Sequence, residues 1–509
     1  MIKIDGYHLT FEDVVKVARK REKVALSTEG HQAIVRSNDW LKSILNSKQP
    51  YYGINTGFGI FANKRIPLDE SARLSRNLIL SHAVGTGPDL PSEIVRAAML
   101  VRANTLTKGF SGVRVEIVQT LLDMLNQGVT PIIPSQGSLG SSGDLCPLSH
   151  MALVFTTDEL DKDEDSGYAF YKNKKMTGKA AMQAAGINRL ILGPKEGLAL
   201  NNGATFSAAL AVLAITDAFY LLNIANTAAA MTLEVILGCP DAFDPMLQEV
   251  RGHPGQIRVA DQIRQQIEQS TLVGSACSVQ DAYSIRCAPQ VHGAVSDTIE
   301  FVSGIIQREI NAATDNPLLF GPEKAYSGGN FHGEPIGMAM DFLGIAISEL
   351  AAISERRVFR LMDEKLNKDL PPMLVNSKEE AGLNSGLMML QYTAAALVLE
   401  NQTLATPDSV HSLPTSAEQE DHNANSMTAA RHARQIIENA AQVFSIELYT
   451  GARAMDLRLR SVPDLHPGKG VSKVFQKIRQ LVPYQPGDAL WNTELQKVRG
   501  LIDRKELEY

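Results

Sequence analysis

The chain has 509 residues, of which 44% are hydrophobic and 21% are charged, an ordinary composition for a globular protein with a sizeable core. Its 49 Lys and Arg residues against 56 Asp and Glu residues leave a net charge of −7. Because no long basic run interrupts this balance, nucleic acid and an anionic membrane surface are not expected as partners.

The N-terminal segment and the cysteines indicate a cellular compartment. Residues 1–15 contain one early lysine but no apolar run and no small-residue cleavage site, so they do not resemble a secretory signal. Four cysteines without CxxC spacing in so long a chain do not make a disulfide scaffold. We therefore expect a reduced, cytoplasmic protein.

Helical patterns begin near the N-terminus. The segment Thr10–Asp13 resembles a capping box, which predicts a helix from Phe11 onwards. Apolar residues between 117 and 125 recur with the spacing of one helix face, and Gly128 supplies a stop signal. Residues 158–175 are strongly polar and predict an exposed excursion.

Long helices are predicted over four stretches that contain no proline, which are 201–239, 290–316, 336–370 and 415–462. Helices of this length cannot bury an apolar stripe alone, so they should pack as a bundle, within one chain or between chains. We expect an N-terminal domain over residues 1–200 and a long-helix bundle domain over residues 201–509.

The most apolar stretch, residues 204–239, could be taken for a membrane span. Asp217 and Glu234 interrupt it, so its charge-free runs fall short of the ~20 residues that a span requires. A helix that is apolar on nearly all sides is more simply buried in a large bundle. No membrane association is therefore expected.

Residues 134–150 form the most unusual segment of the chain, dense in Gly and Ser. Such a run is most often a flexible connector, but here Leu139, Leu145 and Leu148 are interleaved with it and Pro147 stiffens its exit. The pattern predicts a loop packed inside the protein, where Gly is used for unusual backbone angles.

Several motifs with known chemistry do not fit this chain. A serine-hydrolase elbow requires GxSxG, whereas residues 140–143 read GSSG. A phosphate-binding loop would require a lysine that is missing here. Residues 57–62 match GxGxxA, but no strand–helix–strand pattern surrounds them, so that match is discarded.

Instead, Ser141-Ser142-Gly143-Asp144-Leu145 followed by Pro147-Leu148-Ser149-His150 resembles the prosthetic-group loop of the histidine and aromatic amino-acid ammonia-lyases. The usual triplet of that family is Ala-Ser-Gly, and Ser141 stands in place of the Ala. The resemblance implies a methylidene-imidazolone group (MIO) formed from Ser141, Ser142 and Gly143 with loss of two waters. The first residue contributes only its backbone, so Ser141 should not block ring closure.

Further segments match the same family, in order, along nearly the whole chain: 52–59, 81–83, 196–200, 279–287, 313–317, 327–332 and 419–422. The resemblance implies a mainly α fold, a long-helix bundle of the aromatic amino-acid lyase and fumarase–aspartase-like type. It also implies a homotetramer in which each active site is assembled from three chains.

Removal of an amine and a weakly acidic β-proton requires an electrophile, a base and an anchor for the substrate carboxylate. Taken alone, Tyr52 would more often be a packing residue and Arg286 an ordinary ion-pair partner. The resemblance makes Tyr52 the base, and the Arg286 guanidinium can bind a carboxylate bidentately. The other implied contacts are charge stabilisation by Tyr283 and Asn202, polar contacts from Gln280 and Asn316, and an aromatic wall from Phe331.

Three residues bear on the substrate. His82 occupies the family's ring-recognition position, and Glu420 lies in a Gln-Glu-Asp-His segment similar to that of histidine-type members, where phenylalanine and tyrosine members carry Gln. A carboxylate suits an imidazole N–H and would be costly beside a plain phenyl ring. Met388 also resembles the histidine-type pocket. The substrate implied is an amino acid, L-histidine, which would lose ammonia to give trans-urocanate.

Two departures from the family lie near the expected pocket. Asn201 replaces an apolar residue, so it could form an extra hydrogen bond or shift Asn202, and residues 423–427 differ from the usual segment. A tyrosine or phenylalanine ammonia-lyase, or an aromatic 2,3-aminomutase with the same MIO group, therefore stays open, and His82 would suit a tyrosine hydroxyl. A non-catalytic helical scaffold is a remote alternative.

A metal enzyme is the weakest alternative. The chain has scattered histidines, with no HExxH motif and no paired Cys and His spacing. The chemistry implied by the resemblance needs no metal and no diffusible organic cofactor.

Overall fold

The helix signals near the N-terminus are present in the structure, a computed structural model that describes residues 1–46 and 49–507. Helix α1 (Phe11–Lys20) begins with the predicted capping box, in which the Thr10 side chain accepts from the Asp13 N–H. Helix α5 (Val115–Gln127) ends at Gly128, whose φ of 83° is left-handed. Both predictions are confirmed, because these signals act within one turn of helix.

The chain divides into two compact units that are discontinuous in sequence. Unit 1 comprises Met1–Ala214, Ser303–Asp341 and Pro407–Arg431, and unit 2 comprises Ile215–Val302, Phe342–Thr406 and His432–Tyr509. A single domain boundary near residue 200 stays a prediction. The two units are defined by spatial contacts, and the chain returns to unit 1 twice after first leaving it.

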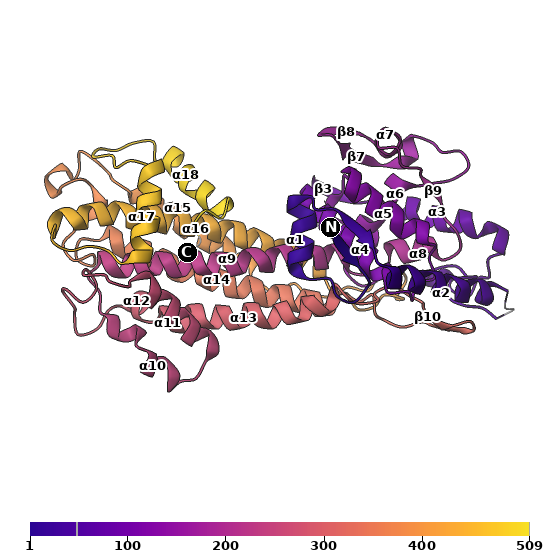
Figure 1. Cartoon of the computed structure of the whole chain (residues 1–509), viewed down its shortest axis with the longest axis horizontal. Helices are drawn as coiled ribbons and strands as arrows, with labels where there is room; N and C mark the ends of the chain where they lie inside the picture. Colours follow the sequence, from indigo (N-terminus) through magenta and orange to yellow (C-terminus); the bar gives the residue numbers. More distant parts are fainter. Residues whose placement is uncertain (47–48, 508–509) are drawn as a thin grey trace. The chain divides into compact units, whose positions relative to one another are not determined.

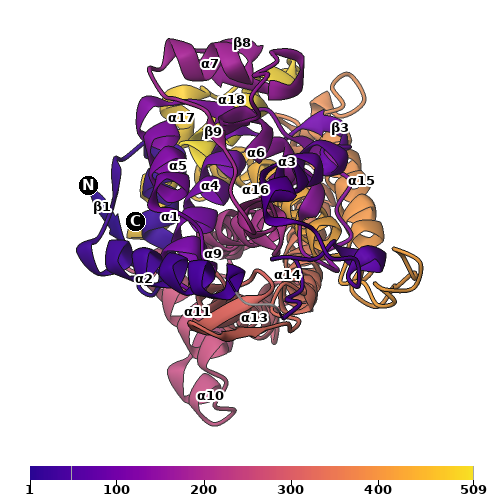
Figure 2. The same cartoon turned by 90° about the vertical axis from the view of Figure 1, so that its right-hand side faces the viewer.

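Helix α4 (Ser92–Thr107) is the central helix of unit 1 and packs against α1, α2 (Thr28–Leu45) and α5 (Figure 2). Its residues from Ile94 to Thr107 are all buried, so its polar side chains need internal partners. The Arg96 guanidinium donates to the carbonyls of Val17 and Leu125, which lie in the last turns of α1 and α5. A cation at helix C-termini is favourable for the helix dipoles.

Short strands connect the helices of unit 1. A parallel pair is formed by β1 (Ile2–Ile4) and β2 (Val24–Leu26), and a second one by β6 (Thr156–Thr157) and β9 (Leu190–Ile191). The antiparallel pairs are β3 (Thr86–Asp89) with β5 (Pro134–Gln136), and β10 (Leu318–Gly321) with β11 (Lys324–Tyr326). The polar segment 158–175 contributes to a hairpin of β7 (Tyr168–Tyr171) and β8 (Lys174–Thr177) beside β4 (Thr130–Pro131).

Three helices of unit 1 bring distant loops together. Helices α3 (Ser71–His82), α6 (Leu145–Phe155) and α8 (Glu196–Asn201) pack against one another. The chain leaves α3 at His82, enters α6 after Gly143 and leaves α8 before Asn202. The packing of these three helices therefore brings together residues that are far apart in sequence.

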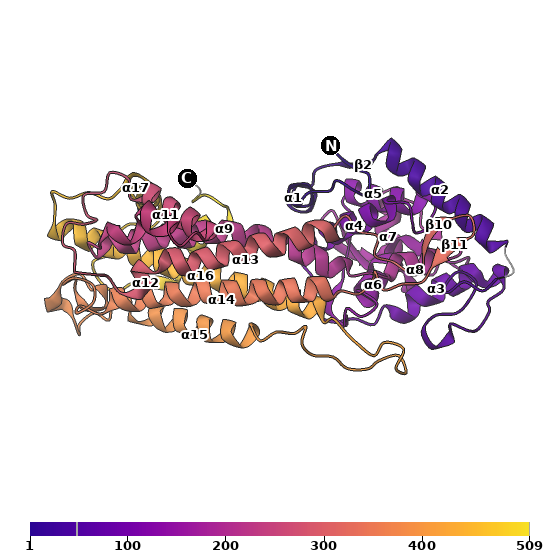
Figure 3. The same ribbon diagram turned by 90° about the horizontal axis from the view of Figure 1, so that it is seen from below.

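Long helices occupy all four proline-free stretches, which confirms the prediction. They are α9 (Thr205–Val235), α13 (Ala288–Glu309), α14 (Glu334–Met362) and α16 (Ser426–Ser461). In unit 2 these helices run side by side (Figures 1 and 3), and the mainly α fold is confirmed. The remaining helices are α7 (Gly178–Ala184), α10 (Pro245–Glu249), α11 (Pro254–Gln266), α12 (Tyr283–Arg286), α15 (Met388–Leu404), α17 (Lys469–Leu481) and α18 (Trp491–Asp503). Short 3₁₀ turns span Gly59–Phe61, Leu68–Glu70, Glu164–Ser166, Pro240–Phe243, Pro372–Leu374 and Lys378–Glu380.

Helices α9 and α14 are long and apolar enough to cross a membrane. In the most apolar window of each, 78% and 72% of the residues are buried inside the structure. Such burial is that of core helices, which agrees with the interpretation of residues 204–239 as part of a bundle.

A buried ion pair links the helices of unit 2. The Glu447 carboxylate accepts hydrogen bonds from Arg357 Nε at 2.6 Å and Nη2 at 2.9 Å, and both side chains are fully buried. The hydroxyls of Thr232 and Ser354 also donate to this carboxylate. Arg357 Nη1 donates to the Ser284 carbonyl, so the same pair restrains α12, the helix of Tyr283 and Arg286.

Candidate active site

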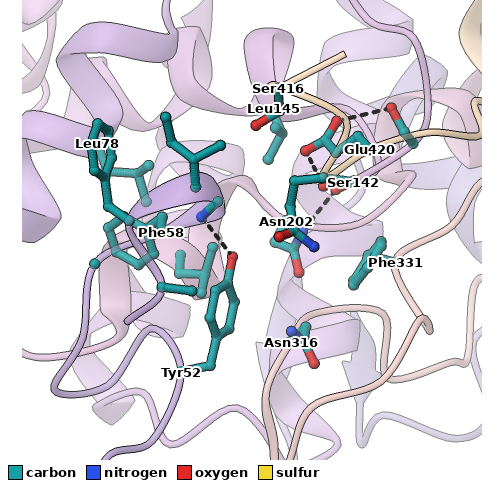
Figure 4. A pocket seen from close by; sticks show the side chains of 18 of the residues that line it. Tyr52, Phe58, Leu78, Ser142, Leu145, Asn202, Asn316, Phe331, Ser416 and Glu420 are labelled. Atoms are coloured by element: carbon teal, nitrogen blue, oxygen red, sulfur yellow. Dashed lines mark hydrogen bonds between the residues drawn. The ribbon is translucent and has the colours of Figure 1, made fainter. Parts of the chain in front are cut away.

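A cavity of about 1180 Å³ in unit 1 is lined by many of the residues that the sequence had singled out. Figure 4 shows Tyr52 on one side of this cavity and Ser142, Asn202 and Glu420 on the other. The predicted residues that line it are Tyr52, His82, Ser141, Ser142, Asn202, Asn316, Phe331 and Glu420. Gly143 directly follows Ser142 in sequence, in the loop that precedes α6.

The Ser/Gly loop is packed inside the protein, as predicted, and its tightest contact is between two glycines. Gly143 and Gly203 form a parallel backbone bridge, and a Cβ on Gly143 would lie 2.0 Å from the carbonyl carbon of Gly203. Both glycines also have left-handed φ angles, 77° and 114°. Both positions require glycine, because a Cβ on Gly143 would collide with the Gly203 backbone and a Cβ on Gly203 would lie 2.6 Å from Thr314 Oγ1.

The bridge fixes the carbonyl oxygen of Ser142. Asn202 Nδ2 donates to it at 2.8 Å and Gly203 N–H at 3.0 Å. Two residues after Ser142, the Asp144 N–H donates to the Gly203 carbonyl at 2.9 Å. Within the described part of the chain, the intervening Gly143 N–H donates no hydrogen bond.

Glu420 faces both serines of the loop. Its Oε1 accepts from Ser142 Oγ at 2.7 Å, and its Oε2 accepts from Ser141 Oγ at 3.1 Å. A backbone bridge between Thr415 and Glu420 closes the turn that carries it. Within the turn, residues 416–418 all have left-handed φ angles of 50–66°, an unusual conformation for three consecutive residues that are not glycine.

Tyr52 belongs to a glycine-rich turn in the first match to the family. Gly53 has a φ of 62°, and its N–H donates to Thr56 Oγ1 at 3.1 Å. The Tyr52 hydroxyl accepts from the Gly59 N–H at 3.2 Å. The turn thus holds the phenol at the cavity surface.

His82 ends α3 on the same cavity. Its Nδ1 lies 2.9 Å from Ser81 Oγ. Burial lowers the pKa of His82 below its ordinary value, and the nearby charge of Glu420 opposes this effect only in part. The imidazole is therefore neutral at pH 7 and can both donate and accept a hydrogen bond.

Asn316 and Phe331 belong to one connected segment. Asn316 Nδ2 donates to Ser327 Oγ at 2.9 Å, and Asn316 Oδ1 accepts from Gly328 N–H at 2.7 Å. These bonds hold the segment that leads to Phe331, whose ring lines the cavity. In this structure Asn316 therefore positions the aromatic wall.

Asn201, the first departure from the family, forms the extra hydrogen bond that was considered. Its Nδ2 donates to Ser149 Oγ at 3.2 Å, and both residues are fully buried. The bond ties the end of α8 to α6. Asn202 still donates to the Ser142 carbonyl.

A group of buried charges beneath the loop was missed by the sequence analysis. Asp144 accepts from Ser138 Oγ, Ser207 Oγ and Ser207 N–H. Burial raises the pKa of Asp144, and these hydrogen bonds oppose that rise. Asp144 stands in the recognised motif, so its position next to Gly143 was the available signal.

Arg102 is the second buried charge. Its guanidinium is fully buried and donates to the carbonyl of Asn202. Burial lowers the pKa of Arg102 to about 10, and the charges of Asp315 and Asp144 oppose this effect. Arg102 therefore stays cationic at pH 7. An arginine in the middle of an apolar helix was the only signal in the sequence, because its partners come from other segments.

Lys195 and Asp315 form a third element of this group. Their side chains are both fully buried, with Nζ 2.6 Å from Oδ2, and Ser111 Oγ donates to Asp315 Oδ1 at 2.9 Å.

Over residues 1–46 and 49–507, no three His, Cys, Asp or Glu side chains are arranged to hold a metal ion.

Four predicted site residues, Gln280, Tyr283, Arg286 and Met388, belong to unit 2 and do not line the cavity. Tyr283 and Arg286 share α12, and the guanidinium carbon lies 4.6 Å from the centre of the phenol ring. The two side chains therefore lie on one face of the helix. Tyr283 is 70% exposed, so its side chain is available to another molecule.

Comparison with known proteins decides the family. Residues 9–480 match the sequence profile described as aromatic amino acid lyase. The chain belongs to the aromatic amino acid lyase family. A histidine ammonia-lyase of Caldanaerobacter subterraneus subsp. tengcongensis is 48% identical over 482 residues, which cover 94% of this chain and 92% of that protein. This aromatic amino acid lyase is therefore an enzyme, a carbon–nitrogen lyase.

Solved structures of the aromatic amino acid lyase family share its fold. Histidine ammonia-lyase from Trypanosoma cruzi superimposes with a TM-score of 0.89 at 37% identity, covering 99% of this chain and 94% of that one. Tyrosine aminomutase from Streptomyces globisporus superimposes with a TM-score of 0.93 at 32% identity, covering 99% and 97%. The long-helix bundle expected from the resemblance is confirmed.

The need for glycine at residue 203, beside the bridge, can be tested by adding one methyl group. In Gly203→Ala the new Cβ would lie 2.6 Å from Thr314 Oγ1 and 2.7 Å from the Thr314 carbonyl oxygen. We expect the free energy of unfolding to fall by about 3 kcal/mol, measured by denaturant titration of the far-UV circular dichroism signal.

Gly186→Ala is the matched control. Gly186 also has a left-handed φ, 70°, but nothing lies within 4 Å of its added Cβ, so the loss should be about 1 kcal/mol. Equal losses in the two variants would mean that the backbone angle alone, and not the close approach, requires glycine at residue 203.

Proposed function

We propose that this lyase eliminates ammonia from L-histidine to give trans-urocanate. The observation that carries the proposal is the Glu420 carboxylate on the cavity wall, hydrogen-bonded to the Ser/Gly loop at 2.7 Å. A carboxylate there can accept a hydrogen bond from an imidazole N–H. A relative named histidine ammonia-lyase, with 48% identity over 94% of the chain, supports the same substrate.

The electrophile is proposed to form from Ser141, Ser142 and Gly143. The Gly143 nitrogen would bond to the Ser141 carbonyl carbon, whose oxygen would leave as water with the amide hydrogens of Gly143 and Ser142, so that a C=N bond forms to the Ser142 nitrogen. The Ser142 hydroxyl would leave with its α-hydrogen as a second water. The residues fit this group, because the Gly143 N–H donates no other hydrogen bond among the described residues. The resulting MIO supplies an electrophilic methylene carbon where Ser142 carried its hydroxyl.

The loop contacts suit a carbonyl that gains negative charge. The Ser142 oxygen receives two hydrogen bonds, from Asn202 Nδ2 and from Gly203 N–H. Two preorganised donors at one oxygen stabilise charge that develops there. Arg102, a buried cation that donates to the Asn202 carbonyl, adds a favourable field and holds Asn202 in place.

Tyr52 is the proposed base for the β-proton. Its phenol is on the side of the cavity opposite Ser142 and Asn202 (Figure 4). A substrate held between them would have its amine toward the loop and its β-carbon toward the phenol. General base catalysis requires such an approach within hydrogen-bond reach.

The proposed selection of histidine uses Glu420 and His82 together. The neutral His82 can accept or donate a hydrogen bond, whereas the Glu420 carboxylate can accept hydrogen bonds but cannot donate them. A substrate with a ring N–H donates to the carboxylate, whereas a phenyl ring would desolvate the carboxylate and offer it no donor. Phenylalanine should therefore bind poorly.

The four predicted residues outside the cavity are proposed to act from other copies of the chain. Arg286 would bind the substrate carboxylate, Tyr283 would support the electrophile, and Gln280 and Met388 would complete the pocket. The exposure of Tyr283, 70%, is consistent with a surface that a second copy covers. We infer a homotetramer with each active site assembled from three chains.

An aromatic 2,3-aminomutase or a tyrosine ammonia-lyase is the second candidate. The similarity to tyrosine aminomutase, with a TM-score of 0.93, favours it, and His82 could hydrogen-bond a phenol. The Glu420 carboxylate argues for histidine, because a phenol offers one donor while an imidazole fits both polar groups of the wall.

The function is tested by near-UV absorbance of the purified protein with L-histidine, L-tyrosine and L-phenylalanine separately. Each elimination gives a conjugated acrylate with its own absorbance, and we expect a rise with histidine alone. The intact mass should be lower than that of the sequence by two waters. A rise only with tyrosine would replace the proposed substrate, and an undiminished mass would exclude the proposed electrophile.

Glu420→Gln should reduce kcat/KM for L-histidine by about 10- to 100-fold, because a charged acceptor for the ring N–H is replaced by a neutral amide. Glu418→Gln is the control, since Glu418 is exposed and lies outside the cavity. Steady-state kinetics measure both. Histidine turnover that is equal in the two variants would remove Glu420 from substrate selection.

Shared active sites predict complementation between inactive variants. Coexpressed Ser142→Ala and Tyr283→Phe chains should regain activity, because mixed oligomers can pair an intact cavity with an intact Tyr283. Coexpressed Ser142→Ala and Glu420→Ala chains should regain none, since both changes fall in the same cavity. Activity per copurified mixed oligomer is the measurement, and recovery in neither mixture would contradict shared sites.

A further inference from the structure

Two of the departures from the family sequence, Ser141 and Asn423, contact each other. Asn423 Nδ2 donates to Ser141 Oγ at 3.0 Å, and Ser141 Oγ in turn lies 3.1 Å from Glu420 Oε2. Asn423 is 1% exposed and Ser141 6% exposed. An alanine at residue 141, the usual residue of the family, would leave the buried Asn423 amide without an acceptor, so each departure accounts for the other.

The direction of this chain of hydrogen bonds is set by the backbone. Leu413 N–H donates to Asn423 Oδ1 at 2.9 Å, so the amide oxygen of Asn423 faces Leu413 and its NH₂ group faces Ser141. The hydroxyl of Ser141 accepts that bond and keeps one proton to donate. A carboxylate can only accept, so the proton of Ser141 is directed to Glu420.

Ring closure would leave Glu420 with a single hydrogen bond from the protein. Among the described residues, its two carboxylate oxygens accept only from Ser142 Oγ and Ser141 Oγ. The Ser142 hydroxyl is lost when the proposed MIO forms, whereas the Ser141 hydroxyl is not part of the ring. Glu420 Oε1 is then released to the cavity while Oε2 stays held.

We propose that Ser141, oriented by Asn423, is a positioning residue that holds Glu420 for recognition of the substrate ring. The proposal rests on the proposed function, in which Glu420 accepts from the ring N–H of the substrate. A hydroxyl donor on Oε2 fixes the carboxylate plane, so that Oε1 meets the ring without first losing side-chain freedom.

The test compares two ligands that differ only in the ring, 3-(imidazol-4-yl)propionate and 3-phenylpropionate. Their dissociation constants are measured by calorimetry with the full-length protein. In Ser141→Ala we expect the preference for imidazole over phenyl to fall about tenfold, because one charge-assisted hydrogen bond to Glu420 is lost. The intact mass should still be lower by two waters, because ring closure uses only the backbone of residue 141.

Three variants separate positioning from structural damage. Ser141→Thr keeps the hydroxyl and should keep the preference. Ser149→Ala removes another buried hydroxyl that accepts from an asparagine, Asn201, without touching Glu420, and should also keep it. In a Glu420→Gln background, Ser141→Ala should reduce the preference by much less than tenfold, because the two changes act through one contact.

Asn423→Asp provides a second route if Ser141→Ala is poorly folded. An aspartate cannot donate to Ser141, so the hydroxyl is free to turn from Glu420 to the new carboxylate. The imidazole preference should again fall severalfold.

The two proposals fail in different ways. A preference that persists in Ser141→Ala with a closed ring, or in Asn423→Asp, would overturn the role of Ser141 alone. A wild-type protein that does not prefer imidazole would overturn the proposed histidine specificity, and the positioning role with it.

Discussion

Gly143 lies so close to the Gly203 backbone that it tolerates no side chain, and the rest of the site is arranged around this contact. It brings the Ser142 carbonyl against two donors and the Asp144 N–H against the Gly203 carbonyl. Because α6 begins directly after Asp144 and α9 two residues after Gly203, two helices take their starting positions from one backbone bridge. Small displacements of either helix would therefore alter the loop that is proposed to form the electrophile.

The two sides of that loop have different physical character. Beneath it are fully buried charges, including Arg102, Asp144 and the Lys195–Asp315 pair. Their burial is costly, and hydrogen bonds with surrounding backbone and hydroxyl groups offset part of that cost. Above the loop, Glu420 is held only by hydroxyl groups among the described residues. The buried side favours a rigid catalytic loop, while the hydroxyl side is where a change of one residue can adjust substrate recognition.

The helical part of the fold was predictable because its signals are local. The Thr10 capping box, the Gly128 stop and the proline-free stretches each act within a few turns of helix. The short strands were not predicted, since pairs such as β6 with β9 contain two residues each and carry no alternating pattern. The sequence pattern also did not predict that residues 303–341 and 407–431 belong to unit 1, because this membership follows from contacts between distant segments.

By itself, the sequence determined the family, the mainly α fold, the Ser141–Gly143 loop and most of the residues that line the cavity. It could do so because a turn of two serines and a glycine, followed by a helix start, has a recognisable local pattern. Only the tertiary structure decided that Asn423 orients Ser141, that Arg102 supports Asn202, and that Tyr283 and Arg286 belong to a different unit from the cavity. Hydrogen bonds between residues 100 or more positions apart depend on helix packing, and no spacing along the chain encodes them.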